Sequence, residues 1–148
     1  MSAQQLLLQK YGPPDDHYLQ AFCFVWEVRN DFLWFPTSHF LVNKDFKDML
    51  FKAFTALVAA GLHTEIKTYD GCYNDRSVRG SQSTSLHAWA AALDINAATN
   101  GMVVNPTPEQ RLGTWTQPFI DTMVAAGLSF GGSFHNRADP MHWGLYDG

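Results

Sequence analysis

The segment SLHAWAAALDIN, residues 85–96, decides how the fold of this chain is interpreted. It holds His87 and Asp94, seven positions apart, inside an otherwise apolar stretch. Its second half, residues 92–96, has the composition of a short buried strand. A carboxylate is costly to bury in such a strand without a partner, and a metal ion is one such partner.

A second segment, DPMHWGL at residues 139–145, supplies Asp139 and His142, three positions apart. Together with His87 and Asp94, His142 completes a set of two imidazoles and one carboxylate, which suits zinc. Three protein ligands leave a fourth tetrahedral position for water, which is the pattern of catalytic rather than structural zinc sites. Asp139 is then a further carboxylate near the metal, where a hydrolase requires a proton-transfer group.

The composition predicts a folded domain and argues against a broad nucleic-acid-binding face. With 148 residues, of which 46% are hydrophobic and 14% aromatic, the chain can bury a substantial core. Its net charge is −4, and its 10 lysines and arginines are scattered rather than clustered. Binding to nucleic acid through a basic surface is therefore not expected. An anionic ligand would have to be held locally, by single arginines.

The N-terminal residues 1–14 contain an apolar run of only three leucines. This run is too short for the hydrophobic region of a signal peptide or for a membrane span. We therefore expect a protein that is made soluble in the cytoplasm, so that a target elsewhere would require separate delivery.

The two cysteines, Cys23 and Cys72, could form one disulfide, although sequence separation alone does not establish the pairing. Sparse cysteine use favours two reduced or buried thiols. Neither cysteine belongs to a zinc-type CxxC pair.

Apolar periodicity and capping residues predict helices over residues 2–11, 44–60 and 117–126. Asn43 is the expected N-cap of the second helix and Thr116 that of the third. Strands are expected over residues 21–28, 63–69, 92–96, 128–132 and 141–145. A few short strands, two main helices and polar loops together indicate an α+β domain.

Three irregular segments are expected between these elements. Residues 71–85, GCYNDRSVRGSQSTS, form a polar loop that leads directly into the first metal motif. Residues 29–40 form an aromatic-rich loop, in which Trp34 and Phe35 either line a substrate wall or, as we favour, cover the core. Residues 101–113 form a further loop with two prolines.

These motifs together resemble those of zinc DD-peptidases, the family of VanY-type carboxypeptidases and phage L-alanyl-D-glutamate endopeptidases. SLHAWAAALDIN is similar to the family's S-x-H-x-x-G-x-A-x-D motif, and DPMHWGL resembles its second motif. GCYNDRSVRGS resembles the arginine-bearing segment upstream, and AAGLSFGGSF resembles the Gly-aromatic-Gly-Gly stretch before the second motif. The resemblance covers about residues 40–145, with the same order and similar spacing.

The resemblance implies a small hedgehog/DD-peptidase-type domain: a short antiparallel sheet, flanking helices and a zinc site in a cleft. His87, Asp94 and His142 would bind one Zn²⁺ per chain. Asp139 would be the general base and acid of a metal-assisted peptide hydrolysis.

The resemblance also assigns residues that would contact the substrate. Arg76 or Arg79 would hold a substrate carboxylate or the developing oxyanion, and the sequence does not choose between them. Ser85 would support the site by hydrogen bonding or contact the substrate. The motif glycine is Ala90 here, which is harmless if φ is negative and strains the loop if φ is positive.

Residues 1–148 are accordingly expected to form a single zinc peptidase domain, without a separate cell-wall-binding domain. Its expected partners are peptidoglycan stem peptides, and we expect a monomer that binds no nucleic acid and no membrane. The first expectation is an L-alanyl-D-glutamate endopeptidase of endolysin type, released to the cell wall by a holin or a secretion system. The alternatives are a D-alanyl-D-alanine carboxypeptidase and a catalytically inactive, zinc-containing module that binds peptidoglycan or has a structural role.

Overall fold

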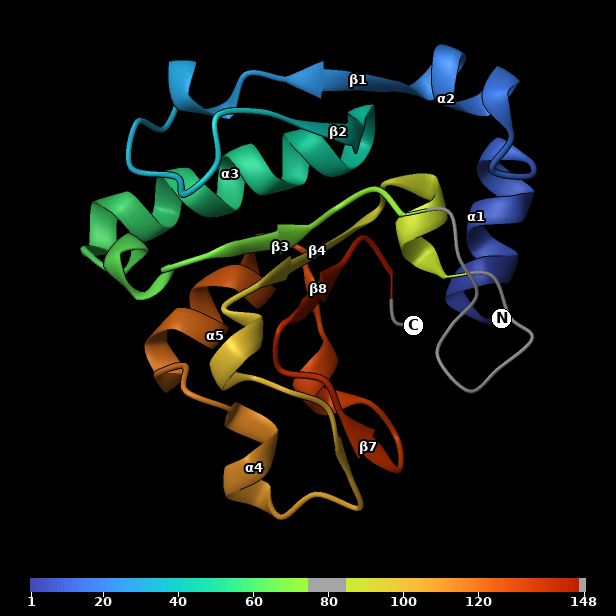
Figure 1. The fold of residues 1–148 in the computed structure, drawn as a ribbon. Helices are drawn as coiled ribbons and strands as arrows, with labels where there is room; N and C mark the ends of the chain where they lie inside the picture. The colour runs from blue at the N-terminus through green and yellow to red at the C-terminus, as the bar shows by residue number, and fades with distance from the viewer. Residues whose placement is uncertain (75–84, 147–148) are drawn as a thin grey trace.

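The computed structural model describes residues 1–74 and 85–146, and a four-stranded antiparallel sheet lies at its centre (Figure 1). The strand order is β3 (Tyr69–Gly71), β4 (Ala92–Ile95), β8 (His142–Gly144) and β6 (Ser129–Phe130). The two metal motifs thus supply the two central strands, β4 and β8. The predicted fold class, a small α+β domain with a short antiparallel sheet and flanking helices, is confirmed.

The register between β4 and β8 determines which side chains share a face of the sheet. Leu93 lies opposite Trp143, and Asp94 lies opposite His142. Because successive side chains of a strand point to opposite faces, Leu93 and Trp143 share one face, where both are fully buried. Asp94 and His142 therefore share the other face.

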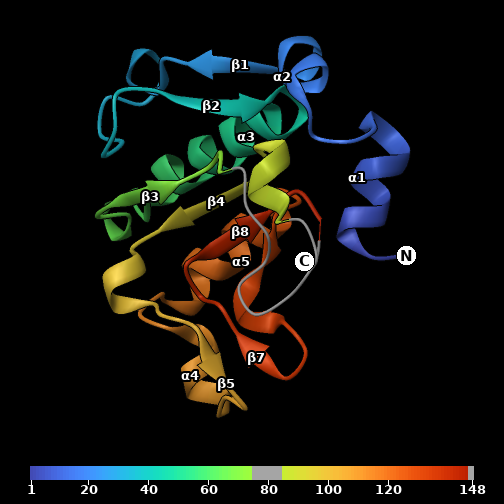
Figure 2. The same cartoon turned by 45° about the vertical axis from the view of Figure 1, so that its right-hand side comes forward.

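Two helices, α3 (Lys44–Ala60) and α5 (Gln117–Ala125), pack against each other and lie behind this sheet in the view of Figure 2. Their caps are those that the sequence predicts. The Asn43 side chain accepts hydrogen bonds from the first turn of α3, and Gly61 ends that helix in the left-handed conformation. Thr116 caps α5.

The N-terminal residues form α1 (Ala3–Tyr11), α2 (Asp16–Phe22) and the strand β1 (Cys23–Trp26). β1 pairs antiparallel with β2 (Phe40–Asn43), and this ribbon packs on α3. In the loop between the two strands, Phe35 is fully buried, with its ring 5.2 Å from that of Phe54. Phe35 therefore covers the core, as expected from its sequence context.

The strand predicted over residues 21–28 is shorter than expected because a helix occupies its beginning. Asp15 accepts a hydrogen bond from the Tyr18 N–H and so caps α2, which continues through Phe22. Only Cys23–Trp26 is strand.

The strand predicted over residues 63–69 is wrong for most of its length. His63–Glu65 form a 3₁₀ turn, and β3 begins only at the last predicted residue. The N–H groups of Lys67 and Thr68 donate to Asn96 Oδ1, at 2.7 and 3.0 Å. A side chain, rather than a neighbouring strand, thus satisfies this stretch of backbone.

Short elements also lie in a segment expected from its sequence to be irregular. Residues 101–113 contain β5 (Val103–Val104) and α4 (Pro108–Leu112). β5 pairs with β7 (Arg137–Ala138), which immediately precedes the second metal motif. The segment at residues 101–113 is therefore held, through β5, beside the residues that precede the second metal motif.

Cys23 and Cys72 are both free thiols, in agreement with the favoured alternative. Within residues 1–74 and 85–146, no helix is long and apolar enough to cross a membrane.

Candidate metal centre

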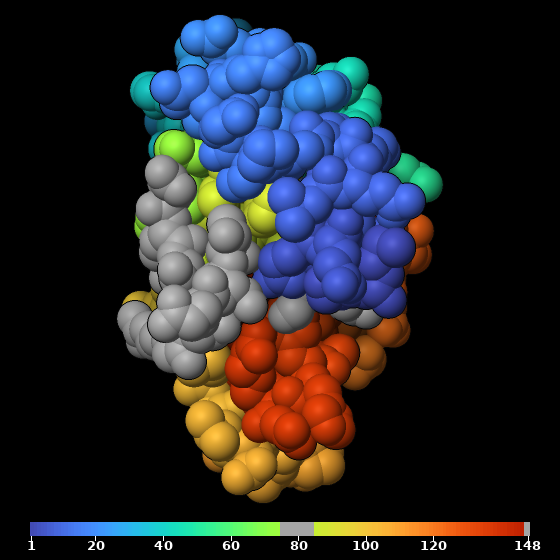
Figure 3. All heavy atoms as spheres, turned by 90° about the vertical axis from the view of Figure 1, so that its right-hand side faces the viewer, coloured from blue at the N-terminus to red at the C-terminus, as the bar shows by residue number. Residues whose placement is uncertain are grey.

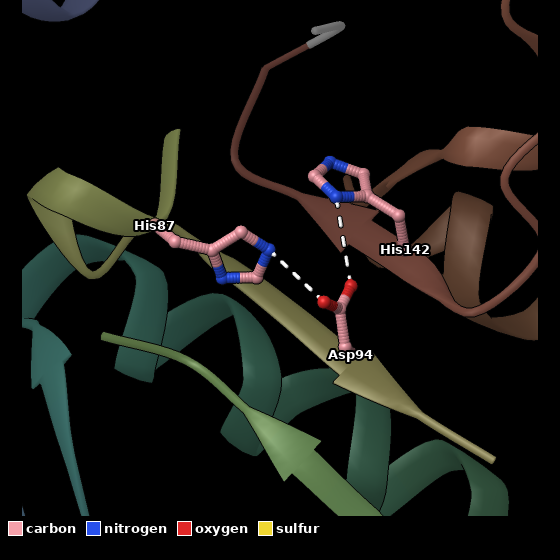
Figure 4. A group of neighbouring side chains, drawn as sticks. All are labelled: His87, Asp94 and His142. Carbon is pink, nitrogen blue, oxygen red and sulfur yellow. Dashed lines mark ion pairs between the residues drawn. The ribbon is translucent and has the colours of Figure 1, made fainter. Parts of the chain in front are cut away.

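Three side chains from different elements converge on one face of the sheet (Figure 4). His87 comes from the 3₁₀ helix η3 (Leu86–Trp89), Asp94 from β4 and His142 from β8. His87 Nε2 lies 3.2 Å from Asp94 Oδ2, and His142 Nδ1 lies 3.7 Å from Asp94 Oδ1. One ligand atom from each residue lies within 4.8 Å of the other two.

This spacing and donor set fit a zinc ion. Ligand atoms placed 2.0–2.1 Å from a tetrahedral ion are about 3.3 Å apart, close to the 3.2 and 3.7 Å that separate the two histidine nitrogens from the Asp94 oxygens. Two imidazole nitrogens and a carboxylate oxygen are donors that zinc accepts readily. The structure therefore brings together the three residues predicted as ligands, in an arrangement that could hold a metal ion.

The orientation of His87 is set by two hydrogen bonds. The Ser85 side chain caps η3 by accepting from the His87 N–H, at 3.2 Å. The His87 Nδ1–H donates to the Cys72 carbonyl oxygen, at 2.8 Å. With Nδ1 protonated, the lone pair of Nε2 faces Asp94 and is available to a metal.

His142 is buried and neutral. Burial lowers its pKa to about 4; the carboxylate of Asp94 opposes this shift, whereas electrostatic interactions with His87 and Arg137 add to it. The Phe134 ring packs against the imidazole, with 5.3 Å between centroids. Since metals bind the neutral imidazole, His142 has the required protonation state at pH 7.

Ala90 adopts the left-handed conformation, with φ 52° and ψ 38°. This resolves the question raised by the absent motif glycine, because φ is positive here. A non-glycine residue in this region costs about 1–2 kcal/mol. The backbone segment that connects His87 to Asp94 is therefore strained at Ala90.

Asp139 lies in the turn that enters β8. Its N–H donates to the Gly131 carbonyl and its carbonyl accepts from the His142 N–H, both at 2.9 Å. A Cβ on Gly131 would lie 2.3 Å from the Asp139 carbonyl oxygen, so this close approach requires glycine. The backbone position of Asp139 beside His142 is thus well defined, and its role in proton transfer stays a prediction.

Residues 79–145 match a protein-family model described as D-alanyl-D-alanine carboxypeptidase. The resemblance to the zinc DD-peptidases is confirmed over this range. No curated protein and no solved structure shows a significant match to the chain. The matched range contains the three candidate metal ligands and Asp139, whereas α1, α2, β1, β2 and α3 precede it.

The predicted substrate residues of this DD-peptidase motif have different outcomes. Arg76 and Arg79 lie outside the described residues. Ser85 is buried and bonds the backbone of His87, and its contact with substrate stays a prediction.

Sequence reasoning missed two arginines that surround the second motif. Arg111 Nη1 donates to the carbonyls of Gly132 and Phe134, at 3.0 and 2.7 Å, and so ties α4 to the turn before Asp139. The Arg137 guanidinium lies 4.7 Å from the centroid of the Phe134 ring, which itself contacts His142. A lone arginine in a polar loop gave no sequence signal for either contact.

Proposed function

We propose that this protein is a zinc-dependent peptidase that hydrolyses the stem peptides of peptidoglycan. The observation that carries the proposal is the convergence of His87, Asp94 and His142 on one face of β4 and β8. Three ligands suit a catalytic rather than a structural ion. The family match over the same segment supports the substrate class.

In the proposed reaction, His87, Asp94 and His142 would hold one Zn²⁺ per chain, which would supply a Lewis acid for the scissile carbonyl and a lowered pKa, toward about 7, for the attacking water. His87 and His142 act as neutral donors, and Asp94 offsets part of the positive charge. Asp139 accepts the proton of the attacking water and passes it to the leaving amine. The position of Asp139, hydrogen-bonded through its backbone to His142, supports this role.

An arginine would complete the site. Arg76 or Arg79 is proposed to hold a substrate carboxylate or to stabilise the developing oxyanion. Ser85 is proposed to act through His87 and to contact substrate only secondarily, since its side chain is buried.

Two scissile bonds are candidates. The L-alanyl-D-glutamate bond follows from the overall resemblance to phage lysins, and such an enzyme would reach the cell wall through a holin or a secretion system. The D-alanyl-D-alanine bond is favoured by the description of the matching family. A zinc-containing module that binds peptidoglycan without cleaving it has no need of a proton-transfer carboxylate such as Asp139.

The test is incubation of the zinc-loaded protein with purified peptidoglycan, followed by mass spectrometry of the released fragments. New peptides beginning with D-glutamate identify the endopeptidase, and loss of a terminal D-alanine alone identifies the carboxypeptidase. Asp139→Ala should retain zinc and lose most turnover, whereas His142→Ala should lose both. Zinc binding and retention on the polymer without any cleavage would replace the peptidase by the binding module.

A further inference from the structure

The strained residue Ala90 lies between two of the proposed ligands, His87 and Asp94. The carbonyls of the two peptide groups that flank its Cα accept hydrogen bonds from residues that lie outside the family match. The Trp89 carbonyl accepts the Tyr18 O–H, at 2.6 Å. The Ala90 carbonyl accepts the Asn43 N–H, at 3.0 Å. The side chain of Asn43 also donates to the Tyr18 hydroxyl, at 2.9 Å, so the two contacts form one connected network.

This network is buried and has further supports. Tyr18 is 1% exposed and Asn43 is fully buried, so water does not compete for these bonds. The Trp89 indole N–H donates to the Gly12 carbonyl, at 3.0 Å. Figure 3 shows the blue N-terminal segment bordering the yellow-green surface of the η3 region.

We propose that Tyr18 and Asn43 are positioning residues for metal binding, because they hold Ala90 in its left-handed conformation and thereby pre-form the turn between His87 and Asp94. This inference rests on the metal site of the proposed function but not on peptidase activity. Without the network, the turn in the metal-free protein relaxes toward negative φ. Metal binding must then restore the strained conformation, so affinity falls.

The chain offers a matched control for Tyr18. Tyr11 packs edge-on against Tyr18, with 5.7 Å between ring centroids, and its hydroxyl interacts with the Asn43 side chain but donates to Asp45 rather than to the Trp89 carbonyl. Tyr18→Phe and Tyr11→Phe each remove one hydroxyl and keep the aromatic packing. Both should lower the unfolding temperature of the metal-free protein, and only Tyr18→Phe should weaken metal binding.

The experiment measures the Zn²⁺ dissociation constant by competition with a chelator, beside thermal unfolding of the metal-free proteins. For Tyr18→Phe we expect a dissociation constant about three- to tenfold higher, the factor that corresponds to one hydrogen bond. For Tyr11→Phe we expect the wild-type value within about twofold, since the turn keeps its donors. Equal dissociation constants in wild type and Tyr18→Phe, or equal weakening in both variants, would overturn the proposal.

Ala90→Gly tests the cause of the effect, because glycine adopts positive φ without strain. In the Ala90→Gly background, Tyr18→Phe should change the Zn²⁺ dissociation constant by less than about twofold. A full effect in that background would contradict the proposed relaxation of the turn. Cys23→Ala, which removes the thiol 3.8 Å from the Trp89 carbonyl, offers a second variant that should weaken binding in the same direction.

These outcomes are separable from those of the proposed function. Zinc binding without peptide cleavage would remove the peptidase and leave the positioning role intact. Cleavage with an unchanged dissociation constant in Tyr18→Phe would do the reverse. A wild-type protein that binds no zinc would overturn both proposals.

Discussion

Asp94 and His142 face each other across the two central strands, with Asp94 Oδ1 3.7 Å from His142 Nδ1. The pairing follows from strand register, because Leu93 and Trp143 fill the core on the opposite face. The same alternation that buries two large apolar side chains therefore brings a carboxylate and an imidazole together. Residues far apart in the sequence become neighbours without any special loop.

Replacing Asp94 by Asn should remove most metal affinity while keeping the fold. The amide has nearly the shape of the carboxylate but lacks the charge that offsets the ion, so we expect zinc affinity to fall by at least about tenfold. Competition with a chelator measures this. Asp121→Asn is the control, since Asp121 is an exposed residue on α5 that bonds Gln117. Equal affinity in the two variants would exclude Asp94 as a ligand.

The metal-free protein should lose stability as the pH falls from about 6.5 to about 4. Burial lowers the pKa of His142 from 6.5 to about 4, so in this range the unfolded chain binds the proton and the folded chain does not. The stabilisation is complete above the unfolded pKa and declines below it, by at most about 3 kcal/mol. Urea unfolding at pH 7 and pH 4.5 measures the loss, which should be smaller in His142→Gln.

The parts of the site that could be predicted are those encoded by neighbouring residues. His87, Asp94 and His142 belong to sequence motifs whose residue types indicate metal ligands. Likewise, the N-cap residue Asn43 predicts the start of α3. The distant partners could not be predicted. The bond from His87 to the Cys72 carbonyl involves backbone, which carries no residue-type signal.

The errors have a similar cause. Residues 67 and 68 alternate as a strand would, but the Asn96 side chain takes up their N–H groups. The positive φ of Ala90 could be posed only as a question, because the flanking carbonyls bond Tyr18 and Asn43, which lie far away in the sequence and which we propose hold this conformation. Tertiary hydrogen bonds therefore decided what local propensity left open.

Gly131→Ala should disturb the turn that carries Asp139. The added methyl would lie 2.3 Å from the Asp139 carbonyl oxygen and 2.8 Å from the His142 Cβ, so the backbone must shift. We expect a loss of about 1–3 kcal/mol in the free energy of unfolding, with weaker zinc binding. Gly101→Ala is the matched control, since nothing lies within 4 Å of its added methyl. Similar stability in both variants would show that the turn tolerates the methyl group.

Arg111→Gln should impair turnover more than zinc binding. Arg111 holds the carbonyls of Gly132 and Phe134 from α4, at 3.0 and 2.7 Å, on the segment that leads to Asp139. Loss of these charge-assisted bonds should cost about 1–3 kcal/mol of stability and loosen the turn that aims the Asp139 carboxylate. If the proposed peptidase function holds, kcat on stem peptides should fall by about tenfold or more, because the proposed proton-transfer group would be misplaced, while the zinc dissociation constant should change little. Glu109→Gln, an exposed change on the same helix, is the control. A parallel loss of zinc and turnover in Arg111→Gln would instead place the effect of Arg111 on His142.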